Sequence, residues 1–209
     1  VFASILVILM FKSWRILKQL PDLKWKDLLL YSASVCFMNV LFYASLGRLP
    51  QGIAVGLEFI GPLALAFFSI QHRGDYLWVM LAILGVGLMV PWQDANAENF
   101  SYLGAAMALG AGLFWASYIY FAQKVARQNI GIHALSIAIV LSALALLPMS
   151  AVHNPSALIQ FEYWPQALMI ALLATAIPYA LDLKTLKTLT KLSYGTLSSL
   201  SPALAAIAG

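Results

Sequence analysis

The sequence LPQGIAVGLEFIGPLALAFFSI at residues 49–70 predicts a membrane-spanning helix with one ionisable residue inside it. About 20 apolar residues, each rising about 1.5 Å, cover a hydrocarbon core of about 30 Å. Glu58 lies near the middle of this stretch, and Pro62 follows four residues later. Because proline has no N–H, the carbonyl of Glu58 loses its helical hydrogen bond. A carboxylate and a released carbonyl are costly in lipid unless they face a cavity or a partner, so we interpret this span as carrying a site.

The composition indicates a multi-pass helical membrane protein. Of the 209 residues, 62% are hydrophobic and only 10% are charged, and the mean hydropathy is +0.86. A soluble domain of this length does not have such a composition, so the expected partner is a lipid bilayer. We therefore do not interpret the net charge of +4 as a nucleic-acid footprint. Cys36 is the single cysteine and the histidines are far apart in sequence, so we expect no disulfide, no metal and no cofactor.

The apolar runs predict six whole spans and two cut ones. The chain begins and ends inside apolar runs, so we expect it to be a fragment of a longer protein. The cut spans are residues 1–11 and the run that follows residue 191. The whole spans are residues 28–48, 49–70, 76–92, 102–123, 132–152 and 166–183.

Small residues predict where these helices approach one another closely. Within 49–70, the string G-I-A-V-G at 52–56 forms a small-xxx-small pattern. In the span 76–92, Gly85 and Gly87 are expected to allow close helix contact in the same way. Helix packing explains these glycines better than a cofactor does.

The positions of the basic residues predict the orientation of the chain. If the polar links alternate between the two sides of the membrane, eleven of the twelve lysines and arginines share one side. Cytoplasmic loops are enriched in lysine and arginine, so that side is expected to be cytoplasmic. Arg48 alone falls on the other side. The eleven are Lys12, Arg15, Lys18, Lys24, Lys26, Arg73, Lys124, Arg127, Lys184, Lys187 and Lys191.

A shift of the chain by 140 residues aligns two span–link–span units, Leu41–Ala66 and Leu181–Ala206, without a gap. Pro62 coincides with Pro202, and Ser198 takes the position of Glu58. The two units lie an odd number of spans apart, so they enter the membrane in opposite directions. Inverted repeats with interrupted helices at matching positions are typical of secondary transporters. The other identities are Leu41/Leu181, Leu46/Leu186, Leu49/Leu189, Leu57/Leu197 and Ala66/Ala206.

Several polar and aromatic side chains inside the spans are candidates for a substrate site. Glu58 is either a carboxylate that binds protons or an ammonium group, or a structural acid bonded to another helix. Asn39 and Tyr43 are one helical turn apart and either bind substrate or join two helices. Trp115 and Tyr118 either line a cavity or pack against neighbouring helices.

Two further candidate positions lie in the last third of the chain. Pro178 releases the carbonyl of Ala174, and Tyr179 beside it offers a hydroxyl group. Asp182 either belongs to the site or is solvated or paired with a nearby lysine. Ser198 and the carbonyl released by Pro202 would form the second copy of the Glu58 position.

Five strings of this sequence resemble the EamA-type transporters of the drug/metabolite transporter superfamily. They are N-V-L-F-Y (39–43), L-P-Q-G-I-A-V-G-L-E-F-I-G-P-L-A (49–64), A-L-G-A-G-L-F-W-A-S-Y-I (108–119), A-T-A-I-P-Y-A-L (174–181) and Y-G-T-L-S-S-L-S-P-A-L-A-A (194–206). The resemblance implies an all-α bundle of ten helices built from two inverted five-helix repeats. On that template, residues 1–98 hold helices 2–5 of the first repeat, and residues 99–209 hold helices 6–9 of the second.

The resemblance also implies a function. We expect a secondary transporter of the bacterial inner membrane that exports small amino acids, threonine- or homoserine-like, or related metabolites. Transport would proceed by alternating access around Glu58 and would be coupled to protons. Three alternatives stay open: another substrate within the superfamily, a non-transporting structural or channel-like protein, and an intramembrane enzyme. The lone deep acid argues against the enzyme.

Overall fold

The computed structural model describes residues 8–9, 25–89, 100–127, 133, 135–144 and 161–200. All regular secondary structure within these residues is helical, as the sequence predicts. The chain divides into two compact units, Val1–Cys36 with Phe121–Thr188, and Phe37–Tyr120 with Leu189–Gly209. We call them the first and the second unit and describe each by itself.

Among the described residues, three helical segments are long and apolar enough to cross a membrane: Trp25–Leu46, Tyr102–Ala126 and Phe161–Thr188. Three more apolar helices are shorter, Gln51–Phe67, Asp75–Leu88 and Leu135–Leu144. Each of the six overlaps one of the predicted whole spans, but several are shorter than predicted. The labelled elements are α2 (Trp25–Leu46), α3 (Gln51–Phe67), α4 (Asp75–Met89), α6 (Tyr102–Ala126), η3 (Phe161–Tyr163), α8 (Trp164–Ile170), η4 (Ala171–Ala176), α9 (Ile177–Thr188) and α10 (Lys191–Ser198).

The helix that carries Glu58 is shorter than the predicted span of residues 49–70. It begins after Pro50, whose backbone is extended, and ends at Phe67. At the other end the N–H of Phe68 still donates to the carbonyl of Ala64, and tighter bonds close the turn over the next two residues. Its 17 residues rise about 25 Å, somewhat less than a hydrocarbon core.

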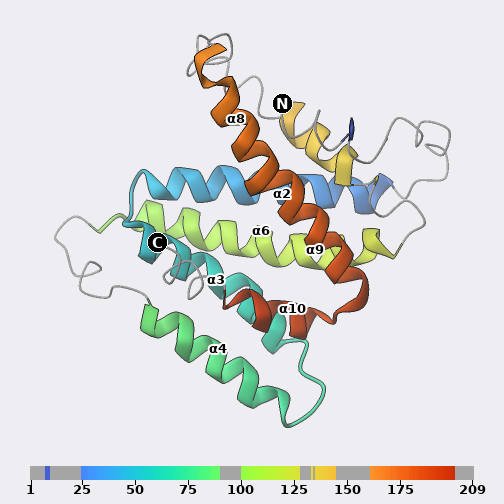
Figure 1. Ribbon diagram of the computed structural model, residues 1–209. Helices are drawn as coiled ribbons and strands as arrows, with labels where there is room; N and C mark the ends of the chain where they lie inside the picture. Colours follow the sequence, from blue (N-terminus) through green and yellow to red (C-terminus); the bar gives the residue numbers. More distant parts are fainter. Residues whose placement is uncertain are drawn as a thin grey trace. The chain divides into compact units, whose positions relative to one another are not determined.

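In the second unit, α3 packs against both α10 and α4 (Figure 1). Its first half forms an apolar cluster around Leu49, Ile53 and Ala54. Its second half forms another cluster with α4, in which Phe59, Leu63 and Val86 are buried. Most of the large apolar side chains of α4 are exposed, as expected for a helix that faces lipid.

The glycines of α4 do not make the close contact that we predicted. A Cβ atom built on Gly85 or Gly87 would meet nothing within 4 Å. Among the described glycines, the closest contact is instead between α3 and α6, where a Cβ atom on Gly61 would overlap the carbonyl group of Gly112. Among the described residues, a Cβ atom at these two glycines would thus meet no neighbour, because helix contact depends on how each helix is rotated as well as on its composition.

In the first unit, Phe161–Thr188 runs as one helical segment in spite of Pro178 (Figure 1). A π-helical turn at Ala171–Ala176 precedes the proline, and the N–H of Ile177 donates to the carbonyl of Leu172, five residues earlier. Wide turns of this kind accommodate a residue that cannot continue the regular bonding pattern. The predicted interruption at Pro178 is therefore a widened turn in a continuous segment. Pro202 lies outside the described residues.

Candidate functional site

Glu58 lies near the middle of α3 and is buried, with 8% of its surface exposed. The described residues contain no hydrogen-bond or ion-pair partner of its carboxylate. The residues around it on α3 are apolar or small, and Phe59 and Pro62 are buried as well. A buried carboxylate without a fixed partner is costly, so this position is suited to a group that arrives and leaves.

The contacts of the next turn of α3 fix the direction in which Glu58 lies. Residues three and four positions apart share a helix face. Gly61, three residues after Glu58, contacts α6 at Gly112. Pro62, four residues after Glu58, contacts α10, where a Cβ atom on Gly195 would lie 2.9 Å from its carbonyl oxygen. Glu58 is therefore on the part of α3 that lies between α6 and α10.

The carbonyl that Pro62 releases is covered by α6. A Cβ atom built on Gly112 would overlap the carbonyl oxygen of Glu58 and lie 3.2 Å from its carbonyl carbon. The α6 backbone can approach so closely because Gly112 has no side chain. The released carbonyl thus faces a neighbouring helix, and within this unit the carboxylate is the polar group of Glu58 that is left to act on a ligand.

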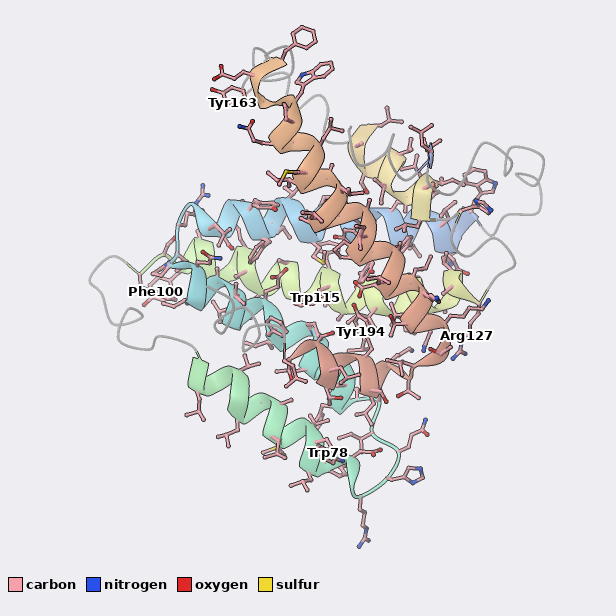
Figure 2. The ribbon with its side chains drawn as sticks, in the orientation of Figure 1. Trp78, Phe100, Trp115, Arg127, Tyr163 and Tyr194 are labelled. Carbon is pink, nitrogen blue, oxygen red and sulfur yellow. The ribbon has the colours of Figure 1, made fainter. Side chains whose placement is uncertain are left out.

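Trp115 reaches the neighbourhood of Glu58 through Phe59. The two rings meet edge to face, with centroids 4.8 Å apart and an interplanar angle of 67°. Trp115 also packs on the apolar cluster formed with α4. Figure 2 shows Trp115 on α6 and Tyr194 on α10. The indole of Trp115 is therefore held by packing against Phe59, which is the residue that follows Glu58 on α3.

Asn39 lies at the depth of the site, on a face of α2 other than the one that contacts α6. The rings of Phe37 and Phe114 stack at 5.1 Å, and a Cβ atom on Gly110 would lie 3.1 Å from Leu41 Cδ1. These contacts give α2 and α6 an antiparallel register in which Asn39 is level with Gly112. Asn39 is two positions from both Phe37 and Leu41, and residues two positions apart differ by about 200° around a helix. Asn39 therefore lies on the face of α2 away from α6.

The two candidate tyrosines of this unit differ in their surroundings. Tyr43, one turn after Asn39, is 67% exposed and makes an edge contact with the ring of Phe42. Tyr118, by contrast, is 1% exposed. The second unit therefore brings Trp115 close to the Glu58 turn. Asn39 shares its face of α2 with Leu46, which packs on the start of α3.

Ser198, the predicted counterpart of Glu58, is partly buried on α10. Its hydroxyl donates to the carbonyl of Tyr194, at 2.8 Å, within the same helix. The other candidates, Tyr179 and Asp182, are partly buried on α9 in the first unit. Each of these two makes an interaction of its own. Among the described residues, no group of three His, Cys, Asp or Glu side chains could hold a metal ion.

The sequence analysis missed the glycines that form this neighbourhood. Gly61, Gly112 and Gly195 each stand where two helix backbones approach. A signal was present, because Gly61 precedes the proline of the Glu58 span and Gly112 lies in the string A-L-G-A-G-L. Which glycine meets which helix depends on contacts far apart in the sequence, so composition alone does not select them.

Comparison with known proteins places the chain among membrane transporters. The sequence model of the EamA-like transporter family matches residues 102–209. The threonine/homoserine exporter RhtA of Escherichia coli strain K12 is 39% identical over 207 residues, which cover 99% of this chain and 68% of that protein. RhtA of Salmonella typhimurium gives the same identity and coverage.

More distant relatives extend this pattern. The uncharacterized transporter YwfM of Bacillus subtilis is 24% identical over 202 residues, which cover 92% of this chain and 67% of that protein. No solved structure matches the chain. The matches to the exporters run across both the Glu58 span and the residues from 102 onward.

Proposed function

The chain belongs to the EamA-like transporter family, and we propose that it exports threonine, homoserine or similar small amino acids across the bacterial inner membrane. As a member of a transporter family it is a multi-pass membrane protein and not an enzyme. The substrate rests on the 39% identity to exporters that bear this name. The single structural observation that supports it is the buried carboxylate of Glu58, which has no partner among the described residues.

The carboxylate of Glu58 is suited to the ammonium group that every amino acid carries. In a site of low dielectric, an ion pair between Glu58 and the substrate is stronger than the same pair in water. Trp115, held edge-on by Phe59, would supply an apolar wall for the substrate side chain. Asn39, Tyr43, Tyr118, Tyr179, Asp182 and Ser198 stay candidates for its carboxylate and hydroxyl groups.

Glu58 would couple export to the proton gradient by carrying one load at a time. From the cytoplasmic side it exchanges its proton for the substrate ammonium, and from the outer side it exchanges the substrate for a proton. Only the two loaded forms cross between the inward-open and outward-open states, because an uncompensated carboxylate in the membrane is costly. Each amino acid that leaves is thereby linked to an entering proton.

The state change would follow the predicted inverted repeat, residues 1–98 and 99–209. In transporters of this kind, one repeat rocks against the other around a central site. The α3–α10 contact joins a helix from each repeat, at Pro62 and Gly195. That contact is consistent with a central position of Glu58 in the transport cycle.

The proposed substrate is tested by exchange in proteoliposomes that hold the full-length protein. Vesicles loaded with unlabelled threonine are diluted into labelled threonine, and uptake is followed against protein-free vesicles. We expect saturable uptake that homoserine competes with. Competition by an unrelated metabolite, with no effect of homoserine, would move the substrate elsewhere in the family. Uptake without saturation or exchange would instead indicate a channel.

A further inference from the structure

We propose that Gly112 of α6 is a positioning residue for Glu58, because its bare backbone covers the carbonyl that Pro62 releases and thereby fixes the turn of α3 that carries the carboxylate. Its kinetic consequence, a change in threonine exchange, rests on the proposed transport function. Its structural part concerns α3 and the portion of α6 up to Tyr120, both within the second unit.

The first step concerns the carbonyl of Glu58. Pro62 cannot donate a hydrogen bond to it, and α3 nevertheless continues to Phe67. A backbone carbonyl without a partner is costly in a membrane and must be covered by a neighbour. A Cβ atom on Gly112 would overlap this oxygen, so the backbone of Gly112 lies directly against it. Its Cα hydrogens can form the weak C–H···O contacts that are common where two helices meet.

The second step concerns how firmly this contact holds the turn. A Cβ atom on Gly112 would also lie 3.2 Å from the amide nitrogen of Gly61. Conversely, a Cβ atom on Gly61 would lie 2.8 Å from the Cα atom of Gly112 and overlap its carbonyl group. The neighbours on both sides are backbone atoms, which cannot rotate away as a flexible side chain can. The two glycines therefore set the height and rotation of the turn from Glu58 to Pro62.

The third step separates Gly112 from the other glycines of this unit. At Gly110 a Cβ atom would meet the end of a leucine side chain at 3.1 Å, and at Gly104 it would meet side-chain atoms of Arg48 and Leu49. The Leu41 methyl group can give way, whereas Arg48 Cβ is fixed to its own backbone, but neither contact involves the backbone of Glu58. Gly85 lies in open space. Gly112 is thus the α6 glycine whose contact bears on the backbone of Glu58 itself.

The test compares Gly112→Ala with the matched control Gly85→Ala in the full-length protein. Threonine exchange gives KM and the maximal rate, and a hydrophobic carbodiimide reports the accessibility of the Glu58 carboxyl group, with the labelled residue identified by mass spectrometry. A methyl group at residue 112 forces α3 away from α6 and moves the carboxylate. We expect KM to rise about tenfold or more and Glu58 to be labelled faster, whereas Gly85→Ala stays within about twofold on both readouts.

A merely structural role would give another result. If Gly112→Ala lowers the amount of folded protein or the maximal rate while KM and Glu58 labelling keep their wild-type values, the proposal is wrong. Should that variant fail to fold, Pro62→Ala gives residue 62 an N–H that draws the carbonyl of Glu58 back into α3. We expect it to alter both KM and labelling, and wild-type values for both would overturn the proposal.

The labelling readout also separates the two proposals from each other. If the wild-type protein exchanges no threonine, the proposed substrate fails. The rate of Glu58 labelling in Gly112→Ala, relative to Gly85→Ala, then still decides whether Gly112 positions the carboxylate.

Discussion

α3 and α10 pack against each other within one unit, yet the polar side chains at their matching positions differ in hydrogen bonding. In the predicted repeat, Glu58 of α3 corresponds to Ser198 of α10. The Ser198 hydroxyl donates to the carbonyl of Tyr194, so its hydrogen-bonding capacity is met by its own helix. The Glu58 carboxylate is buried and has no partner among the described residues. A hydroxyl can donate to a carbonyl of its own helix. An ionised carboxylate only accepts hydrogen bonds, so its partner must come from outside the helix.

α3 and α10 also differ in how their first turns are capped. At α10, the side chain of Thr190 accepts a hydrogen bond from the N–H of Ser193, at 3.1 Å. At α3, Pro50 stands in the capping position and its side chain makes no such bond. α10 therefore has a side-chain cap at its start that α3 lacks. On this comparison we propose that α3 is the element that meets the substrate and that α10 supports it.

The largest expected effect is that of Glu58→Gln. The amide keeps the size of the side chain but cannot pair with an ammonium group as an anion, so we expect threonine exchange to fall by about 100-fold or more. The matched control is Glu162→Gln, because Glu162 is an exposed acid in η3 and its replacement should leave exchange unchanged. Full exchange by Glu58→Gln would make Glu58 a structural acid and remove the contrast with Ser198.

The next effect concerns the crossing of the two helices. A methyl group at Gly195 would lie 2.9 Å from the carbonyl oxygen of Pro62 and 3.0 Å from Cβ of Ala66. We expect Gly195→Ala to lower the free energy of unfolding by about 1–3 kcal/mol, as overpacking does. Gly85→Ala, in open space, should raise it by about 0.5–1 kcal/mol because alanine favours the helix. Thermal unfolding in detergent measures both changes, and equal changes in the two variants would refute the crossing.

A smaller effect is expected at the start of α10. Thr190→Ala removes the side-chain cap and should lower stability by about 1 kcal/mol. Thr196→Ala in the same helix is the control, because the Thr196 hydroxyl bonds back to the carbonyl of Leu192 and caps nothing. That replacement should be neutral or slightly stabilising. Equal losses of thermal stability in both variants would show that α10 does not depend on its cap.

The smallest effect is expected for Ser198→Ala. Because this hydroxyl is already bonded within α10, its loss should change threonine exchange by no more than about twofold. Kinetic measurement in the same vesicles as Glu58→Gln makes the two positions directly comparable. A loss as large as that of Glu58→Gln would mean that Ser198 turns toward the substrate during transport.

The membrane character of the chain and the burial of Glu58 could be predicted from local features. The length of the apolar run around Glu58, the proline at residue 50 and the charge of the polar links are all local. The structure confirms the helix, although it ends at Phe67, earlier than predicted. Local signals suffice here because a membrane helix satisfies its backbone within itself.

The way the helices meet could not be predicted, because rotation about a helix axis depends on non-local contacts. The sequence contains Gly85 and Gly112 as equally good small residues, but only Gly112 lies against another backbone. For the same reason, the one-turn spacing of Asn39 and Tyr43 places them on a shared face without saying which helix that face adjoins. The bond of Ser198 to Tyr194 was also missed, since a serine in a helix can turn either inward or outward.

The most direct test of the account is proton movement driven by substrate. Proteoliposomes that contain the full-length protein and a luminal pH dye are loaded with threonine and diluted into threonine-free buffer of the same pH. If Glu58 exchanges its load between substrate and proton, the lumen acidifies as threonine leaves, and vesicles with Glu58→Gln show neither change. Threonine efflux from wild-type vesicles without any acidification of the lumen would contradict the account.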